Sequence, residues 1–167
     1  MPHSSSCQPP VKKQLLTFLV VFLALGAVTL SVHGHGEAKG IVLERHTLMN
    51  AIKKANKTIS GMVRGKTELD RTAFAASAQN IANNASRSLS MFPDNEASRH
   101  GKGSNAKQNI WSEFDKFSKW NDDMRAHAEK LADMAMTASL DDLKAQHRLL
   151  GKTCGGCHKA YRTKKKH

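Results

Sequence analysis

The chain has 167 residues, three cysteines and a formal net charge of +12. Its length suits one domain, and its many Ala, Leu, Lys and Met residues favour helices. Because the basic residues are mixed with acidic ones and aromatic residues are sparse, we expect a solvated basic surface and no nucleic-acid partner. Attraction to an acidic partner stays open.

Residues 1–36 have the pattern of a secretory leader. Two lysines precede an uncharged, mostly apolar run from Leu15 to Val32, and the small residues Gly34 and Gly36 follow. Because the run is close to the lower limit for spanning a bilayer and no A-x-A site is present, two outcomes stay open. The leader is cleaved near Gly34 or Gly36, or it remains as an N-terminal membrane anchor. In both cases residues 37–167 form one exported domain.

Two helices are expected in the first half of this domain. The first runs from Glu37 to about Val63, and Arg45 is the only charge in its apolar seam. The second runs from Asp70, which suits an N-cap, to Met91. A loop rich in Gly, Ser, Asn and Asp is expected over residues 93–105.

Two further helices are expected after this loop. The third runs from about Ala106 to Thr137, with Trp111 and Trp120 flanking its apolar face. The fourth begins after Ser139, which forms a pattern similar to a capping box with the acidic residue three positions later. No strand pattern and no internal repeat is visible. Four apolar seams and short connections therefore predict an all-α, antiparallel four-helix bundle.

The fourth helix carries the most specific motif of the chain, C-x-x-C-H. Two thiols at this spacing, Cys154 and Cys157, can add across the two vinyl groups of one porphyrin edge. His158 can then bind the iron as its proximal ligand. The intervening Gly155 and Gly156 carry no side chains that would crowd the porphyrin. Both cysteines continue the inward seam of the helix, so a covalent haem would be inserted between helices.

Two other interpretations of the cysteine pair are weaker. Half of a structural zinc site would need a second pair of ligands at similar spacing, and the sequence has no other C-x-x-C and no H-x-x-x-H. A thioredoxin-like redox pair would follow a strand, which the sequence here does not indicate. Because Cys7 lies in the leader, no disulfide framework is expected.

The antiparallel arrangement places the start of the first helix beside the end of the fourth. The haem should then face Arg45 and Met49, which are spaced i,i+4. An unpaired buried charge is costly, so we expect Arg45 to meet a haem propionate, with an acidic side chain of a neighbouring helix as the alternative. Met49 either binds the iron or packs as an ordinary core residue.

The other histidines and methionines are expected to have structural roles. His147 lies on the seam of the fourth helix and is expected to be a hydrogen-bonded core residue. Three other histidines are expected to face solvent, namely His46, His100 and His127. Three methionines are expected to pack in the core, namely Met124, Met134 and Met136.

From Ile41 to Lys165 the sequence resembles the cytochrome c′ and cytochrome c-556 family. The resemblance rests on Arg45-x-x-x-Met49, the Ala73–Ala76 region, Phe92-Pro93, Ile110-Trp111, the run Gly151–His158 and Tyr161-Arg162. It implies one covalent haem c in a periplasmic protein. It also implies that Arg45 approaches a propionate and that Arg162 lies on the proximal side, near His158.

The resemblance implies two functions that differ at the iron. In c-556-like proteins a methionine at the position of Met49 binds the iron, and the protein carries electrons between periplasmic redox partners. In cytochrome c′ proper the iron is five-coordinate and binds nitric oxide or carbon monoxide. We expect electron transfer with His158 and Met49 as ligands, with gas binding as the alternative. No enzyme is expected, since no histidine is placed as a distal base, and a homodimer stays open.

Overall fold

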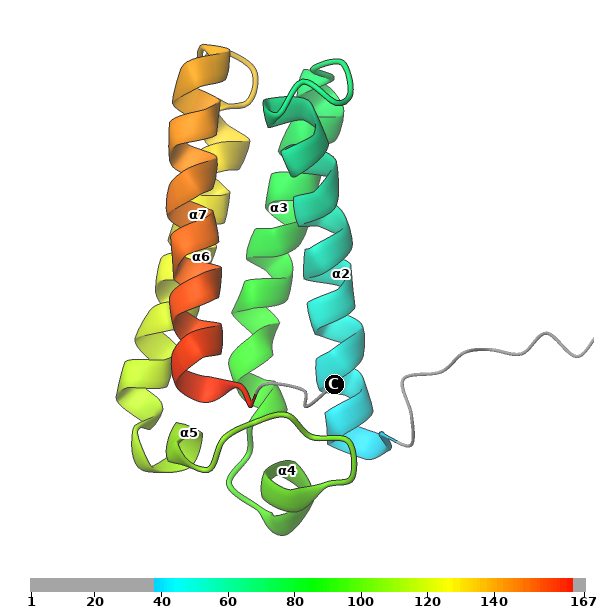
Figure 1. Cartoon of the computed structure of the whole chain (residues 1–167), viewed down its shortest axis with the longest axis vertical. Coiled ribbons are helices and arrows are strands. Elements are labelled where there is room, and N and C mark those ends of the chain that lie inside the picture. The colour runs from blue at the N-terminus through cyan, green and yellow to red at the C-terminus, as the bar shows by residue number, and fades with distance from the viewer. Residues whose placement is uncertain (1–37, 164–167) are drawn as a thin grey trace, which may run out of the picture. The chain divides into compact units, whose positions relative to one another are not determined.

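The computed structural model describes residues 38–163, in which four long helices run alternately in opposite directions (Figure 1). These are α2 (Gly40–Val63), α3 (Arg71–Ser88), α6 (Phe114–Met134) and α7 (Leu140–Tyr161). The closest packing is between α2 and α3, α3 and α6, and α6 and α7. The predicted antiparallel four-helix bundle is confirmed. The expected leader, residues 1–36, lies outside the described residues.

Within residues 38–163, no helix combines the length and the apolar character that a membrane span requires.

The helix ends follow the capping residues of the sequence. The side chain of Asp70 accepts a hydrogen bond from the backbone N–H of Ala73 at 2.9 Å, and Ser139 accepts one from Asp142 at 3.2 Å. Both predicted N-caps are therefore confirmed. Gly65 ends α2 with a φ of +67°, in the left-handed region that favours glycine. These caps fix where the long helices begin and end.

The expected third helix is interrupted. It begins as the short helix α5 (Asn109–Ser112), breaks at Glu113, where φ is −124° and ψ is 35°, and resumes as α6. The carboxylate of Glu113 accepts hydrogen bonds from the Tyr161 hydroxyl and the Asn109 amide, each at 3.3 Å. The prediction of one helix from Ala106 to Thr137 was wrong because this break depends on contacts with α7, and no Pro or Gly marks it.

The expected loop over residues 93–105 contains a helix of its own, α4 (Glu96–His100). Asn95 caps this helix by accepting a hydrogen bond from the Ser98 N–H at 2.9 Å. A 3-10 turn, η2 (Leu89–Met91), leads into the crossover from α3. The crossover connects α3 to α5 and lies at the lower end of the bundle in Figure 1.

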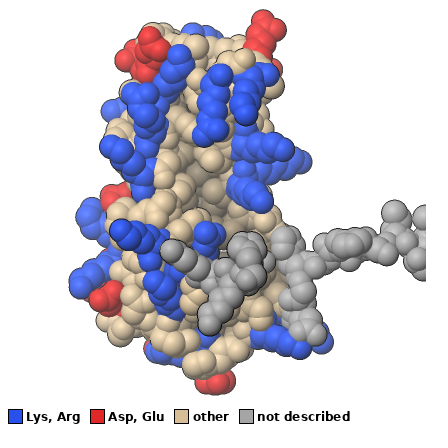
Figure 2. Space-filling view, viewed as in Figure 1, with Lys and Arg blue, Asp and Glu red and all other residues tan. Residues whose placement is uncertain are grey.

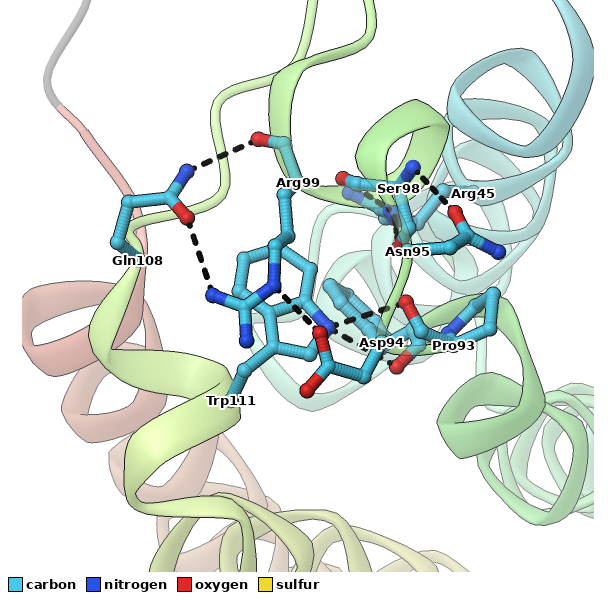
Figure 3. A network of polar contacts seen from close by, with 9 residues as sticks. Arg45, Pro93, Asp94, Asn95, Ser98, Arg99, Gln108 and Trp111 are labelled. Carbon is cyan, nitrogen blue, oxygen red and sulfur yellow. Dashed lines mark hydrogen bonds and ion pairs between the residues drawn. The ribbon is translucent and has the colours of Figure 1, made fainter.

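Polar contacts hold this crossover in place (Figure 3). Arg99 forms an ion pair with Asp94, and its guanidinium lies 5.0 Å from the ring centroid of Trp111. The indole N–H of Trp111 donates to the Pro93 carbonyl at 3.1 Å, and the Gln108 amide donates to the Arg99 carbonyl at 3.0 Å. The segment is therefore a folded part of the bundle.

The end of α7 is joined to the same crossover. The backbone N–H of Lys107 donates to the Tyr161 carbonyl at 2.9 Å, and that of Thr163 donates to the Asn105 carbonyl at 2.9 Å. These contacts hold the C-x-x-C-H segment at the end of the bundle where α2 begins, as the antiparallel topology predicts.

The core has two parts along the bundle. One is mainly aliphatic and is built around fully buried residues such as Ile59, Ile81, Leu131 and Leu143, with Phe74 as its buried aromatic member. The other lies near the crossover and is aromatic. There the ring of Phe117 meets the rings of Phe92 and Tyr161 edge to face, with centroids 4.8 and 5.3 Å away.

Candidate functional site

A cavity of about 530 Å³ lies beside the aromatic part of the core. All six residues singled out in the sequence line it, namely Arg45, Met49, Cys154, Cys157, His158 and Arg162. Its volume is within the range of about 300–1,000 Å³ that is usual for small-molecule and cofactor sites. The fold thus brings residues from the first and last helices of the bundle into one site.

The two cysteines lie one helical turn apart on the cavity wall. Both thiols are free and half-buried. Burial raises the pKa of Cys154, and burial together with the neighbouring Cys154 raises the pKa of Cys157 to about 11. Both groups are therefore protonated at neutral pH. A redox-active cysteine pair needs a thiolate, so this environment does not favour the thioredoxin-like interpretation.

His158 lies at the edge of the cavity, where part of its ring is exposed to solvent. Burial of the rest of the ring, and then the charge of Arg162, lower the pKa of His158. The ring is therefore neutral at neutral pH. Neutral imidazole is the form of histidine that binds a metal ion.

Gly156 is required by a neighbour that the sequence did not reveal. A Cβ atom at Gly156 would lie 2.4 Å from Cη2 of Trp120, whereas one at Gly155 would meet no atom within 4 Å. In the structure, the indole of Trp120 is the group that excludes a side chain at Gly156. Trp120 also lines the cavity. The only signal for this in the sequence was its position beside the apolar face of the expected third helix.

Arg45 is buried, with 6% of its surface exposed, and the protein itself supplies its partners. Its Nε donates to the Met91 carbonyl at 3.0 Å, and its Nη2 donates to the Ser98 carbonyl at 3.1 Å and hydroxyl at 2.8 Å. Nη1 has one longer contact, 3.4 Å, with Ser104 Oγ, and the guanidinium lies 4.2 Å from the Phe92 ring centroid. The partners found are thus carbonyls, hydroxyls and a ring, whereas the sequence suggested an acidic side chain as the alternative to a propionate.

Burial lowers the pKa of Arg45 to about 10, so the guanidinium is charged at neutral pH. Its approach to a haem propionate stays a prediction. The structure shows a further, structural role for Arg45, because its hydrogen bonds connect α2 to the crossover.

Met49 is half-buried and contacts the aliphatic core while it lines the cavity. Two residues with other expected roles also line the cavity. Met124 of α6 is one of them, so its assignment to the ordinary core was incomplete, and His46 is the other, so its assignment to the solvent-facing surface was wrong. His46 lies three residues before Met49, one turn away on α2.

The other three histidines of residues 38–163 do not line the cavity. His147 Nε2 lies 2.9 Å from Asn56 Oδ1, which confirms the expected hydrogen-bonded core histidine. His127 is half-buried, with Nδ1 3.1 Å from Gln146 Nε2, and so does not simply face solvent. His100 is exposed as expected.

Comparison with known proteins shows the family to which the chain belongs. The sequence profile of cytochrome c′ matches residues 40–162. The chain belongs to the cytochrome c′ family. It is 33% identical to cytochrome c-554 of Cereibacter sphaeroides over 121 residues, which is 72% of this chain and 90% of that protein. It is 30% identical to a cytochrome c-556 of Agrobacterium tumefaciens over 126 residues, 75% of this chain and 99% of that protein.

Solved structures show the same fold. Cytochrome c′ from Rhodopseudomonas palustris superposes with a TM-score of 0.70 at 23% sequence identity, covering 77% of this chain and 99% of that one. As a member of the cytochrome c′ family, shown by the match over residues 40–162, the chain is a monohaem c-type cytochrome with one covalent haem c.

The residues present fit that group. Two thiols one turn apart, a neutral histidine next to the second thiol and a large cavity with aromatic walls form the donor set and space that haem c needs. Cys154 and Cys157 would hold the haem covalently. When bound, the haem supplies an iron that changes oxidation state by one electron.

Proposed function

We propose that the protein is an exported electron carrier whose haem iron is held by His158 and Met49. The observation that supports this is that Met49 on α2 and His158 on α7 line one cavity from opposite helices. A thioether is a good ligand for haem iron in electron-transfer cytochromes, and it raises the reduction potential. A carrier of this kind needs no catalytic residue, and we propose none.

The chain's own residues prepare the site for this role. The apolar side chains of Ile52, Ile110 and Phe117 line the cavity and would keep water away from the haem faces that they cover. The rigid α7 positions His158, because its last turn is hydrogen-bonded to the crossover through Lys107. A preorganised site with little water needs little rearrangement when the charge on the iron changes.

The absorption spectra of the purified ferric and ferrous holoprotein test this proposal. Ligation by Met49 predicts low-spin spectra in the wild type, and M49A should become high-spin and bind carbon monoxide. M124A is a matched control, because Met124 is a second methionine on the cavity wall, on α6. A low-spin spectrum of M49A would overturn the assignment of Met49 as an iron ligand. If M49A stayed low-spin and M124A became high-spin, the ligand would be Met124 instead. Because His46 lines the cavity, a peroxidase assay on the same samples tests our proposal that the protein has no catalytic residue.

The second candidate function is binding of nitric oxide or carbon monoxide at a five-coordinate iron. Met49 packs against the aliphatic core, and this contact could hold it away from the iron. A high-spin wild-type spectrum with rapid uptake of carbon monoxide would favour this function over electron transfer. In that case M49A should chiefly widen the pocket and speed gas entry.

Export to the periplasm is the remaining part of the proposal. It is supported by the leader pattern of residues 1–36 and by the family's covalent haem. Mass spectrometry of the periplasmic protein should give a mature N-terminus near His35 to Glu37. Recovery of the full-length chain only with membranes would instead show that the leader is an anchor.

A further inference from the structure

Basic residues flank the hollow on the face of the bundle where α2 and α7 are seen side by side (Figure 2). Figure 2 shows Lys and Arg side chains along α7 and α2, on either side of a hollow between them. The Asp and Glu side chains visible there lie at the ends and the outer edge of this face. We define the basic rim as six exposed residues: Lys53 and Lys57 of α2, Arg148, Lys152 and Lys159 of α7, and Arg162 directly after α7.

The helical spacing places the rim residues of each helix on one face of that helix. Lys53 and Lys57 are spaced i,i+4 on α2, and Arg148 and Lys152 are spaced i,i+4 on α7, with Lys159 seven positions further along the same helix. In α7, no acidic residue follows Asp142. The acidic residue of α2, Glu44, lies nine positions before Lys53 and so on the opposite side of the helix. Like charges without acidic neighbours repel one another, which costs folding energy unless an anionic group binds there.

The haem itself accounts for only part of this charge. Lys53 and Arg162 line the cavity, where they could neutralise propionates, but Lys57, Arg148, Lys152 and Lys159 do not. Within residues 38–163, the ion pairs of the structure involve none of the six rim residues. Four positive charges beside the cavity thus neither line it nor form an ion pair within residues 38–163.

We propose that the basic rim is the docking surface for an acidic redox protein, which exchanges an electron with the haem at this face. The inference rests on the proposed electron-carrier function. In the productive complex the reduced partner loses one electron, and the ferric iron gains it and becomes ferrous; no bond forms or breaks. Complementary charges around the hollow would steer the partner to the side on which Cys154, Cys157 and His158 lie, and would raise the rate of association.

A protein partner fits the rim better than a lipid surface. Interfacial binding to membranes combines basic residues with apolar side chains that insert between lipids. The large apolar side chains exposed in residues 38–163 are Leu43, Phe114, Met136 and Leu149. Only Leu149 lies within one helical turn of a rim residue, three positions before Lys152, and a single apolar side chain does not make the cluster that insertion between lipids requires. The rim also surrounds a concave opening, which suits a convex acidic surface.

The test compares two double variants with the same change in net charge. K57E/K152E alters the rim at positions that do not line the cavity, and K66E/K130E alters two exposed lysines elsewhere, in the α2–α3 turn and on α6. The probe is reduced flavodoxin, an acidic one-electron donor protein, mixed with each ferric holoprotein in a stopped-flow spectrometer. At low salt, the rim variant should react at least about tenfold more slowly than the wild type, and the control within about twofold. The difference should vanish at high salt, where charges are screened.

Three results would overturn the proposal. The two variants could slow equally, which would show that net charge alone matters. The rim variant could react like the wild type. It could also lose binding to phosphatidylglycerol vesicles while keeping the rate with flavodoxin, which would make the rim a lipid-binding face. Spectra of the wild type judge the carrier function separately: a high-spin iron would refute Met49 ligation, while a rate that depends on the rim would still support the docking surface.

Discussion

His147 Nε2 on α7 lies 2.9 Å from Asn56 Oδ1 on α2, and this contact joins the two helices on opposite sides of the cavity. It gives the bundle a polar connection where direct packing between α2 and α7 is sparse. Burial, and then the charge of Arg64, lower the pKa of His147. The neutral ring is therefore the form that the folded protein holds.

The first prediction concerns pH. Because the pKa of His147 is lower in the folded state than in the unfolded state, the unfolded chain binds the proton more readily. Its contribution to stability is complete above the unfolded pKa of about 6.5 and is lost as pH falls through that value toward the folded pKa. The free energy of unfolding, measured with urea, should decrease below about pH 6.5, and less so in H147Q. H100Q, which changes an exposed histidine, should keep the wild-type pH dependence; an equal change in both variants would contradict this assignment.

The second prediction concerns the glycines of α7. G156A should destabilise the protein by about 1–3 kcal/mol, because its Cβ would clash with Trp120. G151A should stabilise it by up to about 1 kcal/mol, since Gly151 is an exposed helical residue with open space around it. Thermal unfolding of the holoprotein measures both. Replacing Trp120 by Phe should relieve most of the cost of G156A, and a double variant no more stable than G156A would argue against the clash.

The third prediction concerns Arg45. R45L would leave the Ser98 and Met91 carbonyls without their donor, which should cost about 2–3 kcal/mol of stability. R45K keeps the charge but has all its donors on one nitrogen, whereas Arg45 binds the two carbonyls through separate nitrogens, so R45K should lie between R45L and the wild type. Amide exchange should rise first in α4, because Ser98 belongs to that helix. If exchange rose evenly over the whole bundle, Arg45 would not be the link between α2 and the crossover.

The fourth prediction concerns covalent attachment. In the wild type, haem should stay with the polypeptide in denaturing electrophoresis and after acid acetone extraction. C154A/C157A should lose it under both treatments and should fold poorly, because bound haem stabilises the folded state. C7S is the control, since Cys7 belongs to the expected leader. Haem that is extracted from the wild type would refute thioether attachment.

The sequence predicted what depends on short-range patterns. Caps such as Asp70 and Ser139 act within one turn of their own helix, and the C-x-x-C-H spacing is itself the geometry of the attachment site. The bundle topology followed from four apolar seams. It placed Met49 and His158 at one end of the bundle, as the structure has them.

What the sequence missed depends on contacts between distant segments. The break at Glu113 is stabilised by Tyr161, which is 48 residues away. The fit of Trp120 against Gly156 and the place of His46 at the cavity depend on how neighbouring helices are rotated about their axes. Apolar periodicity gives that rotation only approximately, so residues at the edge of a seam are the ones most often misassigned.

The hydrogen bonds from Lys107 to Tyr161 and from Thr163 to Asn105 have a consequence for how the molecule opens. A terminal helical turn usually frays by itself. Here it is held by residues more than fifty positions earlier in the chain, so unwinding it must also release the crossover. The turn that binds the haem and the crossover segment before α5 therefore form one cooperative unit. Because this unit contains the last residues of the bundle to be synthesised, the cavity can close only after the whole domain has left the ribosome.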